Sequence, residues 1–278
     1  MQNVARQQRL ADLKARIADL EQRPLLAGGA ALLGQDQQER GELAALAAPA
    51  GLLHEVYADE QRQNGAALGF ALGLARGLLS PARPAILFLQ PAHEAQEVGL
   101  PYGPGLKSFG IEPERLLIGR FKNPAELLWA VEEAVACRAV AAVVAEVLGA
   151  PKVLDFTASR RLSLRAATGG ASVLLVRYGQ QREASAARLR WRIGPAVSQP
   201  PSFDDRAPGA ARWQVVLEKG KLGPGLMEAG LELLLDWTEH GFTPVSGKAP
   251  GPGQRDVTRP SVHGALPAAL GHRLSQAG

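Results

Sequence analysis

The chain has 278 residues, of which 46% are hydrophobic and 21% charged, so it is long enough for one sizeable soluble domain with tails. Its single cysteine, Cys137, excludes a disulfide framework and a cysteine-based zinc site, so we expect a cytoplasmic protein with Cys137 packed in its interior. No run reaches the roughly 18 uninterrupted apolar residues of a membrane span, so we expect no membrane contact. The net charge of +4 is unevenly spread, because residues 157–192 hold eight arginines and one acid, Glu183.

Residues 1–24 are the first expected element, an N-terminal helix that forms an arm. Apolar side chains recur there at spacings of three and four, which places them in one stripe of a helix: Leu10, Leu13, Ile17 and Leu20. Two alternatives stay open for this stripe, packing against its own domain and pairing with a partner helix. Residues 25–49, rich in Ala and Gly, are interpreted as a linker.

Residues 50–240 are predicted to form the core domain, which begins with an alternation of strands and helices. The expected strands are 52–58, 84–90, 116–121, 139–147 and 172–177, and the expected helices are 65–79, 123–138 and 157–168. Several of these strands are continuous apolar runs, which is typical of strands buried on both faces of a sheet. The order predicts an α/β fold with a mostly parallel sheet covered on both faces.

Two of the expected helices carry explicit start and stop signals. Asn123 is the expected N-cap of one helix, because Pro124 follows at the first helical position and Glu126 at the third. Thr157 is the expected N-cap of the other helix, and the pair Gly169-Gly170 is expected to end it.

Beyond Tyr178 the hydrophobic pattern changes to an alternation with a period of two. Residues 188–193, 213–218 and 231–237 are predicted to be antiparallel strands added at one edge of the sheet. From residue 241 the chain is rich in Pro and Gly and has no sustained periodicity, so residues 241–278 are expected to be a disordered tail.

The turn after the first strand is the place where such a fold would carry a phosphate-binding loop. A working loop, G-x-x-x-x-G-K-[ST], supplies a lysine for the outer phosphates and a hydroxyl for Mg²⁺. Residues 58–79 contain no Lys, Ser or Thr, and Asp59 and Glu60 would repel a triphosphate. This turn, with Arg62, Asn64 and Gly65, is therefore interpreted as a degenerate loop, and we expect no nucleotide or metal cofactor and no catalysis.

Seven arginines are the candidate contacts to nucleic acid or to an acidic protein. They are Arg160, Arg161 and Arg165 on an expected helix, and Arg182, Arg188, Arg190 and Arg192 in or before an expected strand. A solvated helix face and a charge-guarded sheet face are the plainer alternatives. If these arginines bind DNA or a partner, we expect alanine at 182, 188 and 190 to weaken binding without unfolding the domain.

Parts of the core resemble RecA. Residues 54–57 and the turn after them resemble its first strand and P-loop, with Asn64 near the position of the lysine. Residues 139–147 resemble the strand with the Mg²⁺-orienting acid, and Glu146 stands near that position. Residues 169–177 resemble the strand before the DNA-binding loop of RecA. The resemblance implies a RecA-like three-layer core, with Arg182 and Arg188 flanking the stretch that matches this loop.

A closer resemblance, over residues 50–240, is to the ImuA family. It rests on Leu-His-Glu-Val-Tyr at 53–57, Pro-Tyr-Gly-Pro-Gly-Leu at 101–106, and the stretches 128–134, 157–162, 185–193 and 213–217. The resemblance implies an accessory protein of damage-inducible translesion synthesis. Its expected partners are an ImuB-type homologue of Y-family polymerases, indirectly an error-prone DnaE-type polymerase, and RecA or DNA.

Two other functions remain open from the sequence. One is a divergent RecA-type ATPase that would use Arg62 and Glu146 in place of the missing groups. The other is a SulA-like regulator of cell division that imitates a RecA protomer.

Overall fold

The computed structural model describes residues 46, 49–93, 99–201, 204, 206–222 and 227–245. The expected N-terminal helix, nearly all of the expected linker and most of the expected tail lie outside the described residues. None of the helices within the described ranges is long and apolar enough to cross a membrane.

A mixed sheet of nine strands organises this part of the chain, in the order β11-β10-β7-β6-β1-β5-β4-β2-β3. Its strands are β1 (Leu53–Ala58), β2 (Ala85–Pro91), β3 (Leu116–Phe121), β4 (Val140–Val147), β5 (Ser172–Tyr178), β6 (Leu189–Pro195), β7 (Arg212–Lys219), β10 (Glu232–Thr238) and β11 (Gly241–Pro244). A separate short ladder pairs β8 (Lys221–Leu222) with β9 (Met227–Glu228).

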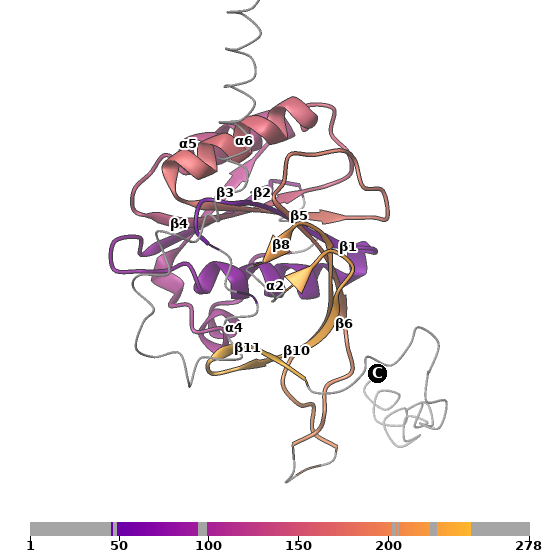
Figure 1. The fold of residues 1–278 in the computed structure, drawn as a ribbon. Helices are drawn as coiled ribbons and strands as arrows, with labels where there is room; N and C mark the ends of the chain where they lie inside the picture. Colours follow the sequence, from indigo (N-terminus) through magenta and orange to yellow (C-terminus); the bar gives the residue numbers. More distant parts are fainter. Residues whose placement is uncertain are drawn as a thin grey trace, which may run out of the picture. The chain divides into compact units, whose positions relative to one another are not determined.

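Helices cover both faces of this sheet, which confirms the expected α/β architecture (Figure 1). The helices are α2 (Asn64–Arg76), α4 (Gly103–Ser108), α5 (Pro124–Ala134) and α6 (Phe156–Gly169), with 3-10 turns η3 (Gln61–Gln63) and η4 (Pro113–Arg115). Strand side chains alternate between two cores. Val56, Leu174 and Val176 belong to the core around α2, whereas Leu53, Val173 and Leu175 belong to the core under α5 and α6.

The direction of β6 differs from the prediction. Strands β6, β1, β5, β4, β2 and β3 are all parallel, and the pairings β6–β7, β7–β10 and β10–β11 at the C-terminal edge are antiparallel. We expected residues 188–193 to form an antiparallel edge strand, but β6 lies inside the sheet, parallel to β1. A hydrophobic period of two indicates that one face of a strand is buried, but it does not indicate in which direction the strand runs within the sheet. Residues 179–188, the crossing segment, carry the chain from β5 past β1 to β6.

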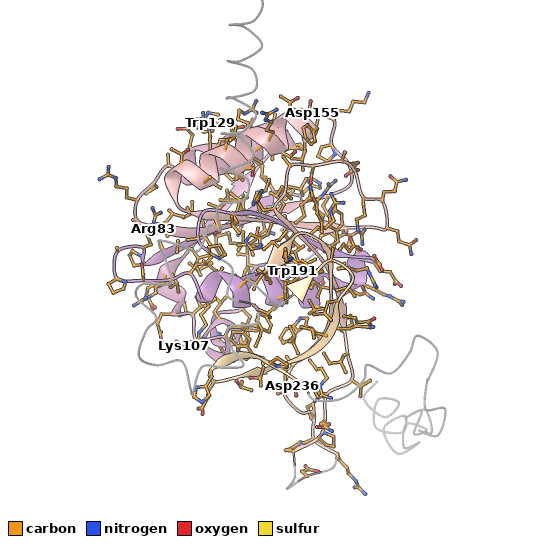
Figure 2. All side chains as sticks on the ribbon, in the orientation of Figure 1. Arg83, Lys107, Trp129, Asp155, Trp191 and Asp236 are labelled. Atoms are coloured by element: carbon orange, nitrogen blue, oxygen red, sulfur yellow. The ribbon has the colours of Figure 1, made fainter. Side chains whose placement is uncertain are left out.

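Helix boundaries follow the caps. Asn123 caps α5 as predicted, since its side chain accepts a hydrogen bond from the Glu126 amide at 2.9 Å. The N-cap of α6 is Asp155 (Figure 2), not Thr157, because the Asp155 carboxylate accepts from the Ala158 amide at 2.7 Å. Gly170 ends α6 in the left-handed conformation at φ 78°. Helix α5 stops at Ala134, so Cys137 lies in the turn beyond it and is exposed, contrary to expectation.

The antiparallel end of the sheet curls over α2 (Figure 1). Strand β11 pairs with β10, so the core extends to Pro244, past the expected boundary at 240. The curl is filled by aromatic side chains, among them Trp191 (Figure 2), which packs edge-on to Phe70 with ring centroids 5.5 Å apart. Helix α2 is thus enclosed by sheet on two sides.

Glycines on α2 make this enclosure possible. A Cβ atom on Gly73 would lie 2.6 Å from Phe242 and 2.8 Å from Trp237. Those distances are shorter than any real carbon–carbon contact, so only a residue without a side chain lets the aromatic rings close over the helix.

We predict that Gly73→Ala destabilises the domain by about 1–3 kcal/mol, because the added methyl group overpacks the aromatic cluster. Gly65→Ala, on the same helix, is the matched control: nothing lies within 4 Å of its Cβ position. The control should be neutral or stabilising, since alanine favours helix by about 0.5–1 kcal/mol over glycine. Urea unfolding followed by tryptophan fluorescence measures both, and equal stabilities of the two variants would contradict the packing assigned to α2.

His54 is the one histidine in this core among the described residues, and it is held neutral. Trp191 Nε1 donates to His54 Nδ1 at 3.3 Å, and Nε2 is buried without a partner. Burial lowers the pKa of His54 to about 4. The unfolded chain binds this proton below about pH 6.5 and the folded chain does not until about pH 4, so the contribution of His54 to stability is complete above pH 6.5 and is lost as the pH falls.

We predict that the wild-type chain loses about 2 kcal/mol of unfolding free energy through His54 between pH 7 and pH 5. His54→Asn keeps an acceptor near the Trp191 N–H but has no proton to bind, so its stability should fall less steeply over that range. Urea titrations at pH 5, 6 and 7 give the two slopes. Parallel slopes would show that His54 does not cause the loss of unfolding free energy at low pH.

Candidate functional site

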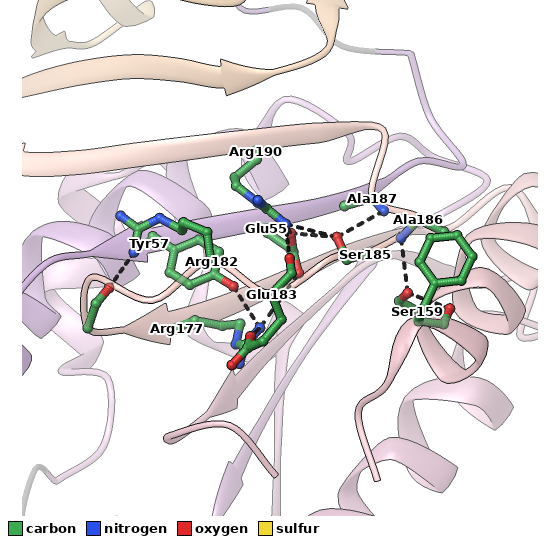
Figure 3. Close-up of polar contacts among 12 residues, drawn as sticks. Glu55, Tyr57, Ser159, Arg177, Arg182, Glu183, Ser185, Ala186, Ala187 and Arg190 are labelled. Atoms are coloured by element: carbon green, nitrogen blue, oxygen red, sulfur yellow. Dashed lines mark hydrogen bonds and ion pairs between the residues drawn. The ribbon is translucent and has the colours of Figure 1, made fainter. Parts of the chain in front are cut away.

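Charged side chains gather on one face of β1, β5 and β6, beneath the crossing segment (Figure 3). The sheet register brings them together. Glu55 on β1 lies opposite Arg190 on β6, and Tyr57 lies opposite Arg177 on β5. Because side chains two residues apart share a face, the parallel pairing places all four on the same side of the sheet.

Glu55 is the most buried charge of this cluster. Its carboxylate accepts hydrogen bonds from Arg190 Nε and from Ser185 Oγ, both at 2.8 Å. Arg177, whose side chain is only 4% exposed, reaches Glu55 at 3.8 Å and pairs with Glu183 at 2.7 Å. The ions are therefore paired within the protein, which a buried charge requires.

Tyr57 forms the floor of the cluster. The guanidinium groups of Arg182, Arg177 and Arg190 lie 4.1, 5.2 and 5.6 Å from the centre of its ring, in the geometry of cation–π contacts. Its hydroxyl accepts from Arg177 Nη1 at 2.6 Å. Burial, with the nearby Glu55 carboxylate, raises the pKa of Tyr57 to about 12, so the phenol stays protonated at neutral pH.

The crossing segment is fastened to the body at several points. Arg182 donates to Asp59 at 2.8 Å and to Glu218 at 2.9 Å, bridging the turn after β1 to β7. Burial alone would lower the pKa of Arg182, but the bonds to Glu218 and Asp59 outweigh it and raise the pKa. Farther along, the Ala186 amide donates to Ser159 Oγ on α6 at 3.0 Å. The segment is thus part of the folded domain and not a free loop.

Ion pairs of this kind neutralise most of the candidate arginines around β6. Arg192 lies 3.5 Å from Glu218 and 4.0 Å from Asp59. Four guanidinium groups therefore meet four carboxylates: Arg177, Arg182, Arg190 and Arg192 against Glu55, Asp59, Glu183 and Glu218. Of the four candidates in this region, only Arg188 is exposed and has no ion pair among the described residues.

The candidates on α6 are also largely engaged. Arg161 Nε lies 2.6 Å from Glu132, and Arg165 lies 3.5 Å from Glu132 and 3.3 Å from Glu133. These contacts join α6 to α5. Arg160 is exposed, with no ion pair within the described ranges. The structure thus distributes the seven candidates over two regions, α6 and the surroundings of β6.

The turn between β1 and α2 holds the other candidates. Asp59 faces Arg182, and Arg62 pairs with its neighbour Glu60. The Gly65 amide at the start of α2 is satisfied by Asn64 Oδ1 at 2.7 Å. On β4, Glu146 is buried and accepts from the Tyr178 hydroxyl at 2.7 Å. No group of three His, Cys, Asp or Glu placed to hold a metal ion occurs among the described residues.

Several members of the cluster were not expected from the sequence, notably Glu55, Tyr57 and Arg177. The signal that could have found them is a charge inside an otherwise apolar strand: Glu55 lies within β1 and Arg177 within β5. Such charges are almost never fully buried unless they are paired. Their register, which the tertiary fold sets, decides that they meet.

We predict that Arg190→Ala destabilises the domain by about 3 kcal/mol, because it leaves the buried Glu55 carboxylate without its closest cation. Arg188→Ala, two residues earlier and exposed, should change stability by no more than about 0.5 kcal/mol. Guanidinium unfolding followed by circular dichroism compares them. Equal stabilities of the two variants would show that the Arg190–Glu55 pair does not stabilise the domain.

The expectation that alanine at 182, 188 and 190 leaves folding intact is therefore not a clean test of binding. Arg182 and Arg190 support the fold through ion pairs, and Arg188→Ala alone separates the two effects.

No protein-family model matches the chain. Two curated proteins are similar to it: Protein ImuA of Caulobacter vibrioides strain NA1000 / CB15N, and Protein ImuA of C. vibrioides strain ATCC 19089 / CIP 103742 / CB 15. Each is 37% identical over 196 residues, which cover 65% of this chain and 76% of the relative.

Proposed function

The chain belongs to the ImuA family, and from that premise we propose that it is a non-catalytic, RecA-like accessory protein of damage-inducible translesion DNA synthesis. In this role it binds an ImuB-type homologue of Y-family polymerases and, through it, serves an error-prone DnaE-type polymerase. The family resemblance is what implies this role, and the structure contributes physical reasons that support an adaptor.

The turn between β1 and α2 carries the non-catalytic part of the proposal. It offers no lysine and no hydroxyl for a nucleotide and its metal, and its acids Asp59 and Glu60 face Arg182 and Arg62. A triphosphate at this turn would have to compete with Asp59 and Glu60 for Arg182 and Arg62, and it would find no lysine for its outer phosphates. Arg62, the substitute that the ATPase alternative needs, is mostly exposed beside Glu60.

The state of the arginines favours a protein over DNA as the main partner. Binding to the phosphate backbone depends on lysines and arginines that exchange counterions for phosphates. Five of the seven candidate arginines already contact carboxylates of the chain itself: Arg161, Arg165, Arg182, Arg190 and Arg192. Arg182 and Arg190 are largely buried, so breaking their ion pairs to reach DNA would cost more free energy than using solvent-exposed cations would.

We predict no rise in melting temperature with millimolar Mg-ATP, and a clear rise with the purified ImuB-type protein. A site with a dissociation constant one hundredth of the ATP concentration would stabilise the chain by about 2.7 kcal/mol, which thermal unfolding detects easily. Stabilisation by Mg-ATP, and not by ATP without magnesium, would overturn the non-catalytic assignment in favour of the ATPase.

A co-elution experiment with two candidate partners separates the adaptor from a SulA-like regulator. The tagged chain is mixed with the ImuB-type protein and, in parallel, with the cell-division protein FtsZ. Co-elution with the ImuB-type protein supports the adaptor, whereas co-elution with FtsZ alone would contradict it.

A further inference from the structure

The two ends of the sheet are finished differently. At one end β11 and β10 fold over α2, but at the other end β3 is the last strand, and β2 is its sole strand neighbour among the described residues. In a parallel pair, the N–H and C=O groups of alternate residues point away from the neighbour. The outer side of β3 therefore presents a row of backbone donors and acceptors to which another strand can bind.

Apolar side chains accompany this open edge. Leu117 is 53% exposed and Ile118 is 42% exposed. They are consecutive, so they lie on opposite faces of the sheet, next to Leu87 and Phe88 of β2 respectively. Neither face of the sheet is fully covered at this edge, so a docked strand can add apolar side chains beside Leu117.

The edge is also positively charged. Arg120 lies within β3 and is exposed, and Arg115 and Lys122 flank the strand. The strand itself contains no acid, and these three cations have no ion pair among the described residues. The nearby Glu112 is 3.8 Å from Lys107, so it already has a cation. Unlike the ion-paired arginines around β6, the cations of this edge are available to a partner.

We propose that the β3 edge is a docking strand for an extended segment of a partner protein, apolar at alternate positions and acidic beside them. A strand satisfies the outward backbone groups. Its apolar side chains extend the face of Leu117, and its carboxylates, on the opposite face, pair with Arg120 and Lys122. The inference rests on the proposed adaptor function, because it supplies the surface through which an adaptor holds its partner.

Hydrogen–deuterium exchange on the full chain tests the proposal directly. With the ImuB-type protein bound, the amides of residues 116–121 that point away from β2 should exchange at least about tenfold more slowly, because added strand pairing closes them. A synthetic peptide of alternating glutamate and valine should slow the same amides, and a lysine–valine peptide of equal length should not. A charge contact without strand pairing would leave this exchange unchanged.

A charge-reversal variant and a matched control complete the experiment. Arg120→Glu with Lys122→Glu should weaken binding of the partner and of the glutamate–valine peptide about tenfold. Arg138→Glu with Lys152→Glu changes the net charge equally, at exposed positions outside β3, and should bind like the wild type. Circular dichroism verifies that both variants are folded.

The outcomes separate the edge from the adaptor function. If the ImuB-type protein binds without protecting residues 116–121, the docking strand is wrong and the adaptor stands. If the ImuB-type protein does not bind, the proposed adaptor function is wrong, and the peptides then test the docking strand. A glutamate–valine peptide that does not protect residues 116–121 would overturn the docking strand. Protection of the outward-facing amides already in the free chain also overturns it, since a segment of the chain itself then occupies the edge.

Discussion

The buried carboxylate of Glu55 is the constraint around which this domain is arranged. A charge in the middle of an apolar strand is tolerated only when cations and hydrogen bonds replace the water it has lost. Here Arg190 comes from β6, Arg177 from β5 and the Ser185 hydroxyl from the crossing segment. Three consecutive elements that are distant from β1 in sequence must therefore meet it, which ties the order of the central strands to one side chain.

The same constraint accounts for the place of β6. The chain leaves β5, passes over β1 and enters the sheet beside it in the same direction, with the crossing segment held by Arg182 to Asp59 and Glu218. The sheet then turns antiparallel only from β7 onward. The parallel centre with its antiparallel extension is what allows β10 and β11 to curl back over α2 and its glycines.

For function, the important consequence is how the cations are distributed. Residues 157–192 have the arginine-rich composition of a nucleic-acid-binding surface, but most of these arginines form ion pairs with carboxylates of the chain itself. The cations near β3 are fewer and lie beside an unpaired strand edge with exposed apolar side chains. This distribution of cations supports the proposed recognition of a partner protein rather than of phosphates, in line with the chain's membership of the ImuA family.

The sequence by itself determined the local features of this protein. Most strands and helices of the core, the Asn123 cap, the stop at Gly170 and the family motifs follow from residues that are neighbours along the chain, because periodicity, capping and turn chemistry act over a few positions. Helix α4 was not predicted. Strand limits were predicted within one or two residues, although the helix start at Asp155 and the early end of α5 were missed.

Only the tertiary structure decided the direction of β6, the inclusion of β11 and the partners of the arginines. Arg161 meets Glu132 across 29 residues and Arg190 meets Glu55 across 135, and nothing in a local pattern states such pairings. The alternation in residues 188–193 correctly put the arginines on one face. Whether that face would be solvent or a set of carboxylates depended on the sheet register, which is a property of the packed chain and not of any segment of it.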